Sequence, residues 1–187
     1  MNWLTHFLTG YLIARLKGYK YNQFETFYIS LACTIPDFDV LFIAFAPHGT
    51  WSHTLLFGLV LAIIYASIFY IIIRKSGKIS NASFIYLILF AIIGVLAHLF
   101  KDIFTYLKGD CLNSIAHLYF YPFSNFSVHM NCIWPNTTYL HRILVEYIYF
   151  GILIVLIIYR WIKYNENLLH LFKISDWKKI YHENRKN

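Results

Sequence analysis

The feature that most constrains the fold is an apolar run from Leu55 to Ile73, in which nineteen consecutive residues carry no charge. As an α-helix, a run of this length crosses the hydrocarbon core of a bilayer, which is about 30 Å thick. A single segment in lipid must be helical, because only a helix satisfies all of its backbone hydrogen bonds internally. The run therefore predicts a membrane-spanning helix.

Two later segments have the same character. Residues Phe84 to Phe100 are uncharged unless His98 is protonated. Residues Ile143 to Ile162 carry charges only near their ends, at Glu146 and Arg160. Both segments are long and apolar enough to cross a bilayer, so they predict a second and a third span.

The beginning of the chain differs, because its two apolar stretches, Trp3 to Leu16 and Phe24 to Ile35, are each too short to cross a bilayer. They predict a tight helical hairpin. The composition agrees with a membrane protein, since 59% of the residues are apolar and 13% are charged. The charged fraction is about half that of an average soluble domain. We therefore expect an all-α, polytopic membrane protein with three spans and an N-terminal helical hairpin.

The net charge is +7, which in a soluble protein would suggest nucleic-acid binding. Here the charges follow membrane topology, because thirteen of the sixteen lysines and arginines fall on one side if the chain alternates between sides. The positive-inside rule makes that side cytoplasmic. The sequence thus predicts a multi-pass protein of the cell membrane, with lipids and not nucleic acid as partners, and with residues 101–142 facing outward.

The end of the chain, residues 163–187, mixes apolar residues with lysines and is predicted to be cytoplasmic. Its pattern fits either an interfacial helix on the anionic inner leaflet or a solvated basic tail. We therefore divide the chain into a membrane-embedded domain, residues 1–162, and a basic amphipathic tail, residues 163–187.

The assignment of segments to the two sides of the membrane also places most histidines and aspartates on one side. Seven of the nine histidines and four of the five aspartates fall on the predicted outer side. Ionisable groups near the bilayer are costly and usually functional. Their convergence from separate segments favours a binding or catalytic site at the outer face.

His98 and Asp102 lie four residues apart, so on a helix both side chains leave the same face. An imidazole and a carboxylate at this spacing can hold one divalent cation, or can form a plain hydrogen bond at a helix end. By the same criterion His141 and Glu146, which are five residues apart, do not share a helical face and are left out of the predicted site.

Asp37 and Asp39 follow Pro36, which ends the preceding helical stretch. In an extended turn, carboxylates two residues apart point the same way. Two such charges next to apolar sequence repel each other unless a cation or hydrogen-bond donors compensate them. The segment therefore predicts either a metal site or a capped turn in which Asp39 is the N-cap of a following segment.

His48 and His53 are five residues apart in the segment before the first span, so they can act together only from a non-helical turn. His6 lies at the same level if the N-terminal hairpin forms. Together with the aspartates, these histidines supply nitrogen and oxygen ligands without cysteine, which suits zinc, manganese or a pair of metal ions. Metal-assisted hydrolysis is the natural chemistry of such a site.

Taken in order, these motifs resemble a known family. They are Thr5-His6 with Gly10, Pro36-Asp37-x-Asp39, His48 with Ser52-His53-Thr54-Leu55-Leu56, His98-Leu99-x-x-Asp102 with Thr105, and Pro122-Phe123-Ser124. The ordered set, over residues 3–124, looks like the LexA-regulated, YdjM-type inner-membrane metal-dependent hydrolases. That family is considered related to the zinc phospholipase C and S1/P1 nuclease group, all-helical enzymes that hydrolyse phosphodiesters.

The resemblance implies that seven residues are metal ligands or catalytic groups. They are His6, Asp37, Asp39, His48, His53, His98 and Asp102. The chain departs from the family at Gly49, where the family usually has an arginine that could hold an anionic substrate.

We therefore expect a membrane-embedded, phospholipase C-like metal-dependent hydrolase that acts on a phosphoester or related ester, such as that of a lipid, at the outer interface. His48, His53, His98 and Asp102 are the expected ligands of a zinc or manganese ion. Asp37 and Asp39 are expected to serve as ligands or as the catalytic base that positions the attacking water.

Two other functions would use the same residues. A divalent-cation transporter would bind the ion transiently, although the uncharged centres of the predicted spans offer no second polar layer through which it could leave. A non-enzymatic membrane scaffold would bind no metal in stoichiometric amount.

Overall fold

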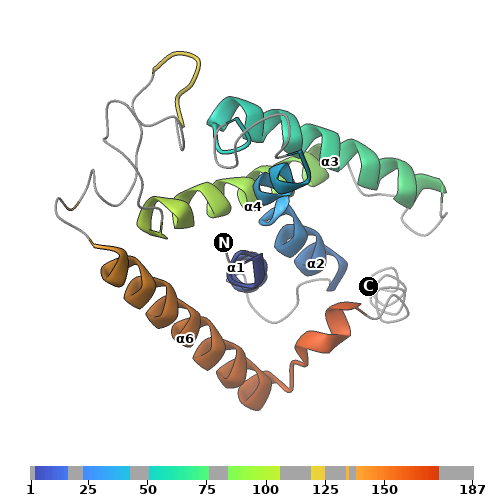
Figure 1. The fold of residues 1–187 in the computed structure, drawn as a ribbon. Helices are drawn as coiled ribbons and strands as arrows, with labels where there is room; N and C mark the ends of the chain where they lie inside the picture. Colours follow the sequence, from blue (N-terminus) through green and yellow to red (C-terminus); the bar gives the residue numbers. More distant parts are fainter. Residues whose placement is uncertain are drawn as a thin grey trace.

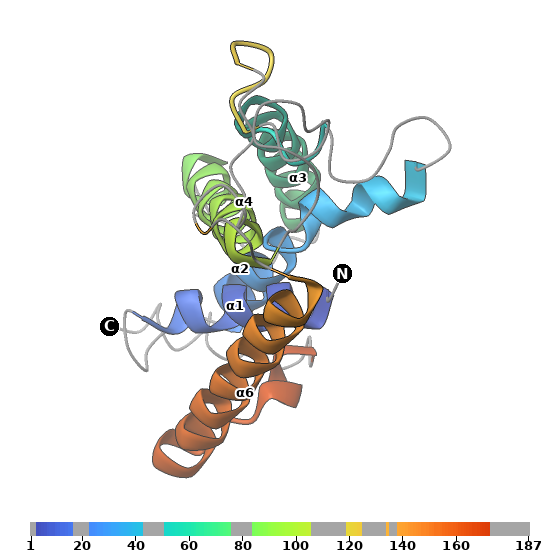
Figure 2. The same cartoon turned by 60° about the vertical axis from the view of Figure 1, so that its left-hand side comes forward.

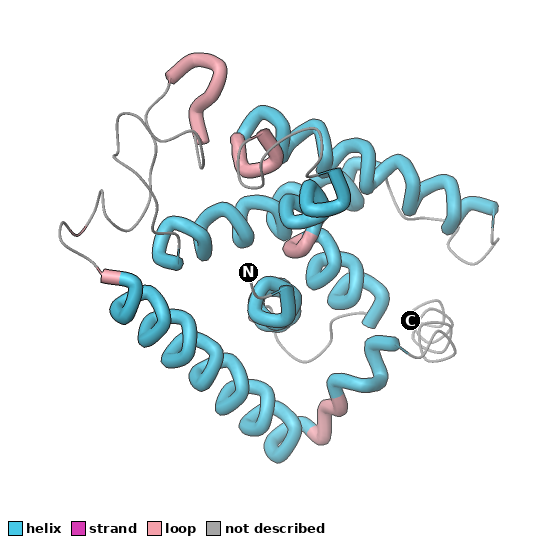
Figure 3. Tube along the Cα trace, viewed as in Figure 1, coloured by secondary structure: helices cyan, strands magenta, loops and turns pink. Residues whose placement is uncertain are grey.

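A computed structural model describes residues 3–16, 23–42, 51–75, 84–105, 119–124, 134 and 138–172. Every regular element in these ranges is helical, as Figure 3 shows. The elements are α1 (Trp3–Arg15), α2 (Gln23–Ala32), the 3-10 helix η1 (Ile35–Phe42), α3 (Leu55–Lys75), α4 (Phe84–Thr105), α6 (Tyr139–Tyr164) and the 3-10 helix η2 (Leu168–Phe172). The expected all-α fold is confirmed.

Three of the helices, α3, α4 and α6, are long and apolar enough to cross a membrane. They contain the three predicted spans, and each is longer than the apolar run that predicted it. The extension matters most in α4, which continues through Lys101 and Asp102 to Thr105. The polar end of α4 therefore projects its side chains from a regular helix.

The predicted N-terminal hairpin is also confirmed, because α1 and α2 pack against each other. α2 also contacts α4, and Figure 1 shows α2 next to both α1 and α4. Two glycines allow this close packing, since a Cβ atom on Gly10 would lie 2.7 Å from Ser30 Cα, and one on Gly94 would lie 2.9 Å from the backbone nitrogen of Cys33. α2 is thus held between two helices that each present a glycine to it.

The core between α2, α3 and α4 is aromatic. The ring of Tyr28 packs on the rings of Tyr65 and Phe69, with centroids 4.6 and 5.1 Å away. Each buried hydroxyl is satisfied by a backbone carbonyl, because Tyr28 donates to Leu87 O at 2.9 Å and Tyr65 donates to Tyr28 O at 3.0 Å. A buried hydroxyl needs such a partner, so these bonds fix how the three helices pack.

α6 contacts the rest of the molecule along a narrow stripe, and Figure 2 shows it extending away from α3 and α4. Two of its polar side chains contact α1: Thr5 Oγ1 donates to Glu146 Oε1 at 3.0 Å, and the hydroxyls of Thr9 and Tyr149 lie 2.7 Å apart. η2 then folds back onto the hairpin, so that Phe172 stacks on Phe7. The polar stripe and η2 together attach α6 to the hairpin.

At the opposite end of α6, two arginines share one carboxylate. Glu166 pairs with Arg15 from the end of α1, and it accepts a hydrogen bond from Arg160 Nε at 2.8 Å. Both arginines belong to the set that the sequence assigns to the cytoplasmic side. The shared carboxylate shows that the two helix ends lie together, while their orientation across the membrane remains a prediction.

The packing of α2 on α4 is testable at Gly94. Gly94→Ala should lower the free energy of unfolding by roughly 1–3 kcal/mol, because the added methyl group would overlap α2. Gly151→Ala in α6 is the matched control, since its Cβ atom would meet nothing within 4 Å. Unfolding of the purified protein in detergent measures both, and equal stability of the two variants would contradict this packing.

Candidate metal centre

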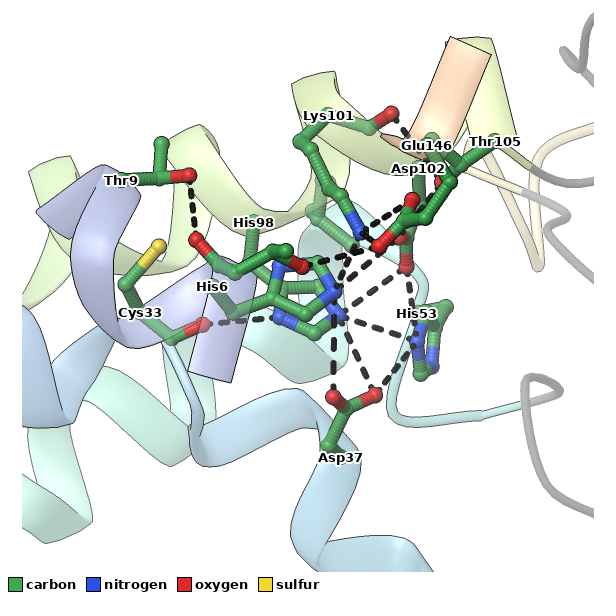
Figure 4. A network of polar contacts seen from close by, with 12 residues as sticks. His6, Thr9, Cys33, Asp37, His53, His98, Lys101, Asp102, Thr105 and Glu146 are labelled. Carbon is green, nitrogen blue, oxygen red and sulfur yellow. Dashed lines mark hydrogen bonds and ion pairs between the residues drawn. The ribbon is translucent and has the colours of Figure 1, made fainter. Parts of the chain in front are cut away.

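Five side chains from four segments converge at one point of the fold, as Figure 4 shows. All of them are buried. They are His6 of α1, Asp37 of η1, His53 of the turn before α3, and His98 and Asp102 of α4. Residues separated by almost a hundred positions in the sequence thus form one cluster.

The part on α4 follows the predicted helical spacing. His98 Nε2 lies 3.0 Å from Asp102 Oδ2. The other ring nitrogen, Nδ1, lies 2.8 Å from the backbone carbonyl oxygen of Cys33 in the tight α2 contact. A carbonyl can only accept, so Nδ1 carries the proton and Nε2 presents its lone pair to the cluster, the usual tautomer of a metal-binding histidine.

Asp37 and Asp39 lie in a 3-10 helix, so the expected extended turn is wrong. With about three residues per turn, side chains two positions apart point in different directions. Asp37 is fully buried in the cluster, and its carboxylate lies 3.5 Å from His98 Nε2, 3.6 Å from His53 Nε2 and 3.8 Å from His6 Nε2. Neither oxygen of Asp37 makes a hydrogen bond.

Asp39 lies behind His53. Ser52 Oγ donates to Asp39 Oδ2 at 2.5 Å, and it lies 2.8 Å from His53 Nδ1. Because the Ser52 proton goes to the carboxylate, Ser52 Oγ accepts the bond from His53 Nδ1. These two hydrogen bonds orient the His53 ring so that its Nε2 atom points into the cluster. His53 lies in a non-helical turn, as the sequence predicts.

His53 and His6 complete the cluster from opposite sides. His53 Nε2 lies 3.1 Å from His98 Nε2 and 3.2 Å from Asp102 Oδ2. His6 Nε2 lies 3.3 Å from Asp102 Oδ1, and its ring stacks on that of His98 with centroids 3.7 Å apart. Each carboxylate therefore presents one oxygen towards His6 and the other towards His53 and His98.

The spacing of these atoms fits ligands around a cation. Four ligands arranged tetrahedrally at zinc bond lengths are about 3.3 Å apart. The measured separations among His53, His98, Asp37 and Asp102 run from 3.0 to 3.6 Å. One atom each from His6, Asp37, His98 and Asp102 also lie within 4.8 Å of one another. The buried donors thus form a group that could hold a metal ion.

The pKa values of His6 and His53 are shifted in opposite directions. Burial, and then the neighbouring His98, lower the pKa of His6 to about 4. Burial also acts to lower the pKa of His53, but the carboxylates of Asp102 and Asp37 outweigh it and raise that pKa to about 9. At neutral pH and without a metal, His53 therefore carries a proton and His6 does not.

The structure brings together five of the seven predicted site residues: His6, Asp37, His53, His98 and Asp102. Asp39 contacts the cluster only through Ser52 and His53, at 3.8 Å from His53 Nδ1. His48 lies outside the described residues.

Two charged residues beside the cluster were not predicted from the sequence. Lys101 Nζ lies 3.4 Å from His6 Nε2 and 3.1 Å from Glu146 Oε2. Lys101 follows His98 by three residues, and this spacing on one helical face was the available signal. Glu146 does not share a helical face with His141, and its partners belong to α1 and α4.

Metal affinity should depend on pH through His53. A metal ion must displace the proton of His53 below pH 9, so the apparent affinity should rise by up to about tenfold per pH unit from pH 6 and level off near pH 9. Titration of zinc into the detergent-purified, metal-free protein at several pH values measures this. An affinity that levels off at the ordinary histidine pKa of about 6.5 would contradict the proposed protonation of His53.

One protein-family model matches most of the chain. The model of the YdjM inner membrane protein family matches residues 1–174, which include all of the cluster and the three helices that could span a membrane. No match is found among curated proteins or solved structures. The match covers most of the chain, and the chain therefore belongs to the YdjM inner membrane protein family.

Proposed function

We propose that this protein is an integral membrane hydrolase that uses a divalent metal ion, zinc or alternatively manganese, held by His6, Asp37, His53, His98 and Asp102. Its proposed substrate is a phosphoester or related ester, such as that of a membrane lipid. The observation that carries the proposal is the Asp37 carboxylate, which is fully buried among three histidine Nε2 atoms with no hydrogen bond to either oxygen.

Electrostatics supports a cation at this point. Asp37 and Asp102 present carboxylate oxygens within 4.8 Å of each other, and both are buried. Burying two like charges so close together is costly unless an opposite charge compensates them. Without a metal, the proton on His53 supplies one positive charge. A divalent ion, which would displace that proton, would supply two.

The ligand types suit zinc or manganese. Imidazole nitrogen and carboxylate oxygen are ligands of both metals, and no cysteine sulfur belongs to the described cluster. A divalent ion bound there supplies a Lewis acid that makes water reactive at neutral pH and stabilises charge on a phosphoryl or acyl oxygen.

The protein itself supplies orientation. Cys33 O and the Ser52 hydroxyl accept hydrogen bonds from the Nδ1 atoms of His98 and His53, so both rings keep Nε2 towards the cluster. In metal sites, a hydrogen bond to the ring nitrogen that does not bind the metal commonly fixes the orientation of the histidine ring. In this proposal Asp37 is a ligand, and Asp39 is a positioning residue that acts on His53 through Ser52.

The position of the cluster supports a substrate from the membrane. His98 and Asp102 lie in the last two turns of α4, a helix long and apolar enough to span the bilayer. A site at the end of a spanning helix lies near the level of lipid headgroups. The outward orientation of this end rests on the distribution of lysine and arginine.

Metal content is the first test. Wild-type protein, purified in detergent, should contain at least one equivalent of zinc or manganese by inductively coupled plasma mass spectrometry, and His98→Ala and Asp102→Ala should lose it because each removes a central ligand. His141→Ala is the matched control, since His141 is exposed and lies outside the cluster. A wild type that stays empty after dialysis against both metals would favour the scaffold function.

Turnover is the second test of the same proposal. The metal-loaded protein should hydrolyse bis(p-nitrophenyl) phosphate or a short-chain phospholipid, and Asp37→Asn should reduce the rate by about a hundredfold or more, as loss of a metal-site group commonly does. Chelation should abolish the activity and added metal should restore it. A metal-loaded protein that moves the ion across proteoliposomes without turnover would instead be a transporter.

A further inference from the structure

Lys101 is a buried cation at the edge of the metal-ligand cluster. It lies on the same face of α4 as His98 and Asp102, and its side chain is 7% exposed. Its ammonium nitrogen lies 3.1 and 3.2 Å from the two oxygens of Glu146 and 3.4 Å from His6 Nε2. Figure 4 shows Lys101 and Glu146 beside Asp102.

Lysine is rarely buried unless it is paired. A buried ion pair is also weak evidence of stabilisation, because desolvation of the charges offsets their attraction. The pairing with Glu146 therefore explains how Lys101 is tolerated, but it does not explain why a lysine lies next to metal ligands. An ammonium group at that position is suited to bind an anion.

The open side of the cluster coincides with this lysine. The side chains of His6, Asp37, His53 and His98 are at most 2% exposed, whereas those of Asp102 and Glu146 are 11% and 22% exposed. Among these described residues, the more exposed side chains therefore lie on the side of the cluster where Lys101 is found.

We propose that Lys101 Nζ forms an anion subsite that binds a phosphate oxygen of the substrate while the same phosphate group faces the His/Asp cluster. Glu146 from α6, itself held by Thr5, keeps the ammonium in place when no anion is bound. This inference rests on the proposed function, since it assigns the substrate of the same site as a phosphate compound.

Orthophosphate binding to the metal-loaded protein, measured by isothermal titration calorimetry in detergent, is the test. Lys101→Met should weaken binding by about tenfold or more, because it removes a charged hydrogen-bond donor. Lys101→Arg should stay within a few-fold of wild type, because it keeps the charge. Glu146→Gln should bind phosphate more tightly than wild type, because it removes the carboxylate charge that competes with the anion for the ammonium.

Two results would overturn the inference. One is a Lys101→Met protein that keeps its metal and binds phosphate as wild type does. The other is a loss of phosphate binding in Glu146→Gln as large as that in Lys101→Met, because a pair that only anchors α6 would fail equally from either side. If Lys101→Met does not fold, Glu146→Gln decides alone: tighter phosphate binding than in wild type supports the subsite, and unchanged or weaker binding overturns it.

Metal content, measured first in every variant, separates this inference from the proposed function. A wild type without metal overturns the proposed function. A set of metal-loaded variants in which substitution of Lys101 has no effect on phosphate binding overturns only the anion subsite.

A second titration, with dihexanoyl phosphatidic acid in parallel with orthophosphate, identifies the source of the phosphate group. Tighter binding of the lipid assigns the subsite to a lipid headgroup, tighter binding of orthophosphate assigns it to a free phosphate, and in both cases Lys101→Met should weaken both.

Discussion

The structure depends on the burial of two carboxylates, Asp37 and Asp102, against three imidazole rings. Such an arrangement requires positive charge, because carboxylates out of water and close together repel each other. Part of the compensation belongs to the protein, as the raised pKa of His53 shows. A divalent metal ion would displace that proton and supply two positive charges in its place, and the spacing of the donors is that of ligands around a cation.

The surrounding helices serve to bring these donors together. Spanning helices must be largely apolar, so α3 and α4 leave room for polar groups only near their ends. The short N-terminal hairpin and η1, whose helices are much shorter than α3 and α4, supply His6 and Asp37. Gly10 and Gly94 let α2 approach α1 and α4, and the same close contact places Cys33 O on His98 Nδ1. Helix packing and ligand orientation thus share one interface.

Much of this arrangement could be predicted from the sequence. The three spans were found because apolar runs of sufficient length have few alternatives, and the His98 and Asp102 pair was found because helical spacing is local. Contacts between distant segments could not be read in the same way. Glu146 was not predicted because its partners lie on other helices. The spacing of Lys101 from His98 indicates a shared helical face, but not the contacts of Lys101 with His6 and Glu146.

The two aspartates after Pro36 show the limit most clearly. Their spacing was right for two carboxylates on one face of an extended segment, but the chain forms a 3-10 helix, which separates Asp37 from Asp39. The local sequence did not reveal the helix, because its position depends on packing against α3 and α4. Asp39 thereby became a partner of Ser52 and not a member of the cluster.

The central claim is that the buried donors of this cluster bind a metal ion directly, and X-ray absorption at the metal edge tests it most directly. With zinc added to the purified protein in one equivalent, the spectrum should show nitrogen and oxygen ligands at about 2.0–2.1 Å, with the multiple scattering of imidazole rings and no sulfur. A sulfur shell, or an oxygen shell without imidazole scattering, would show that the ion binds elsewhere and would contradict the claim.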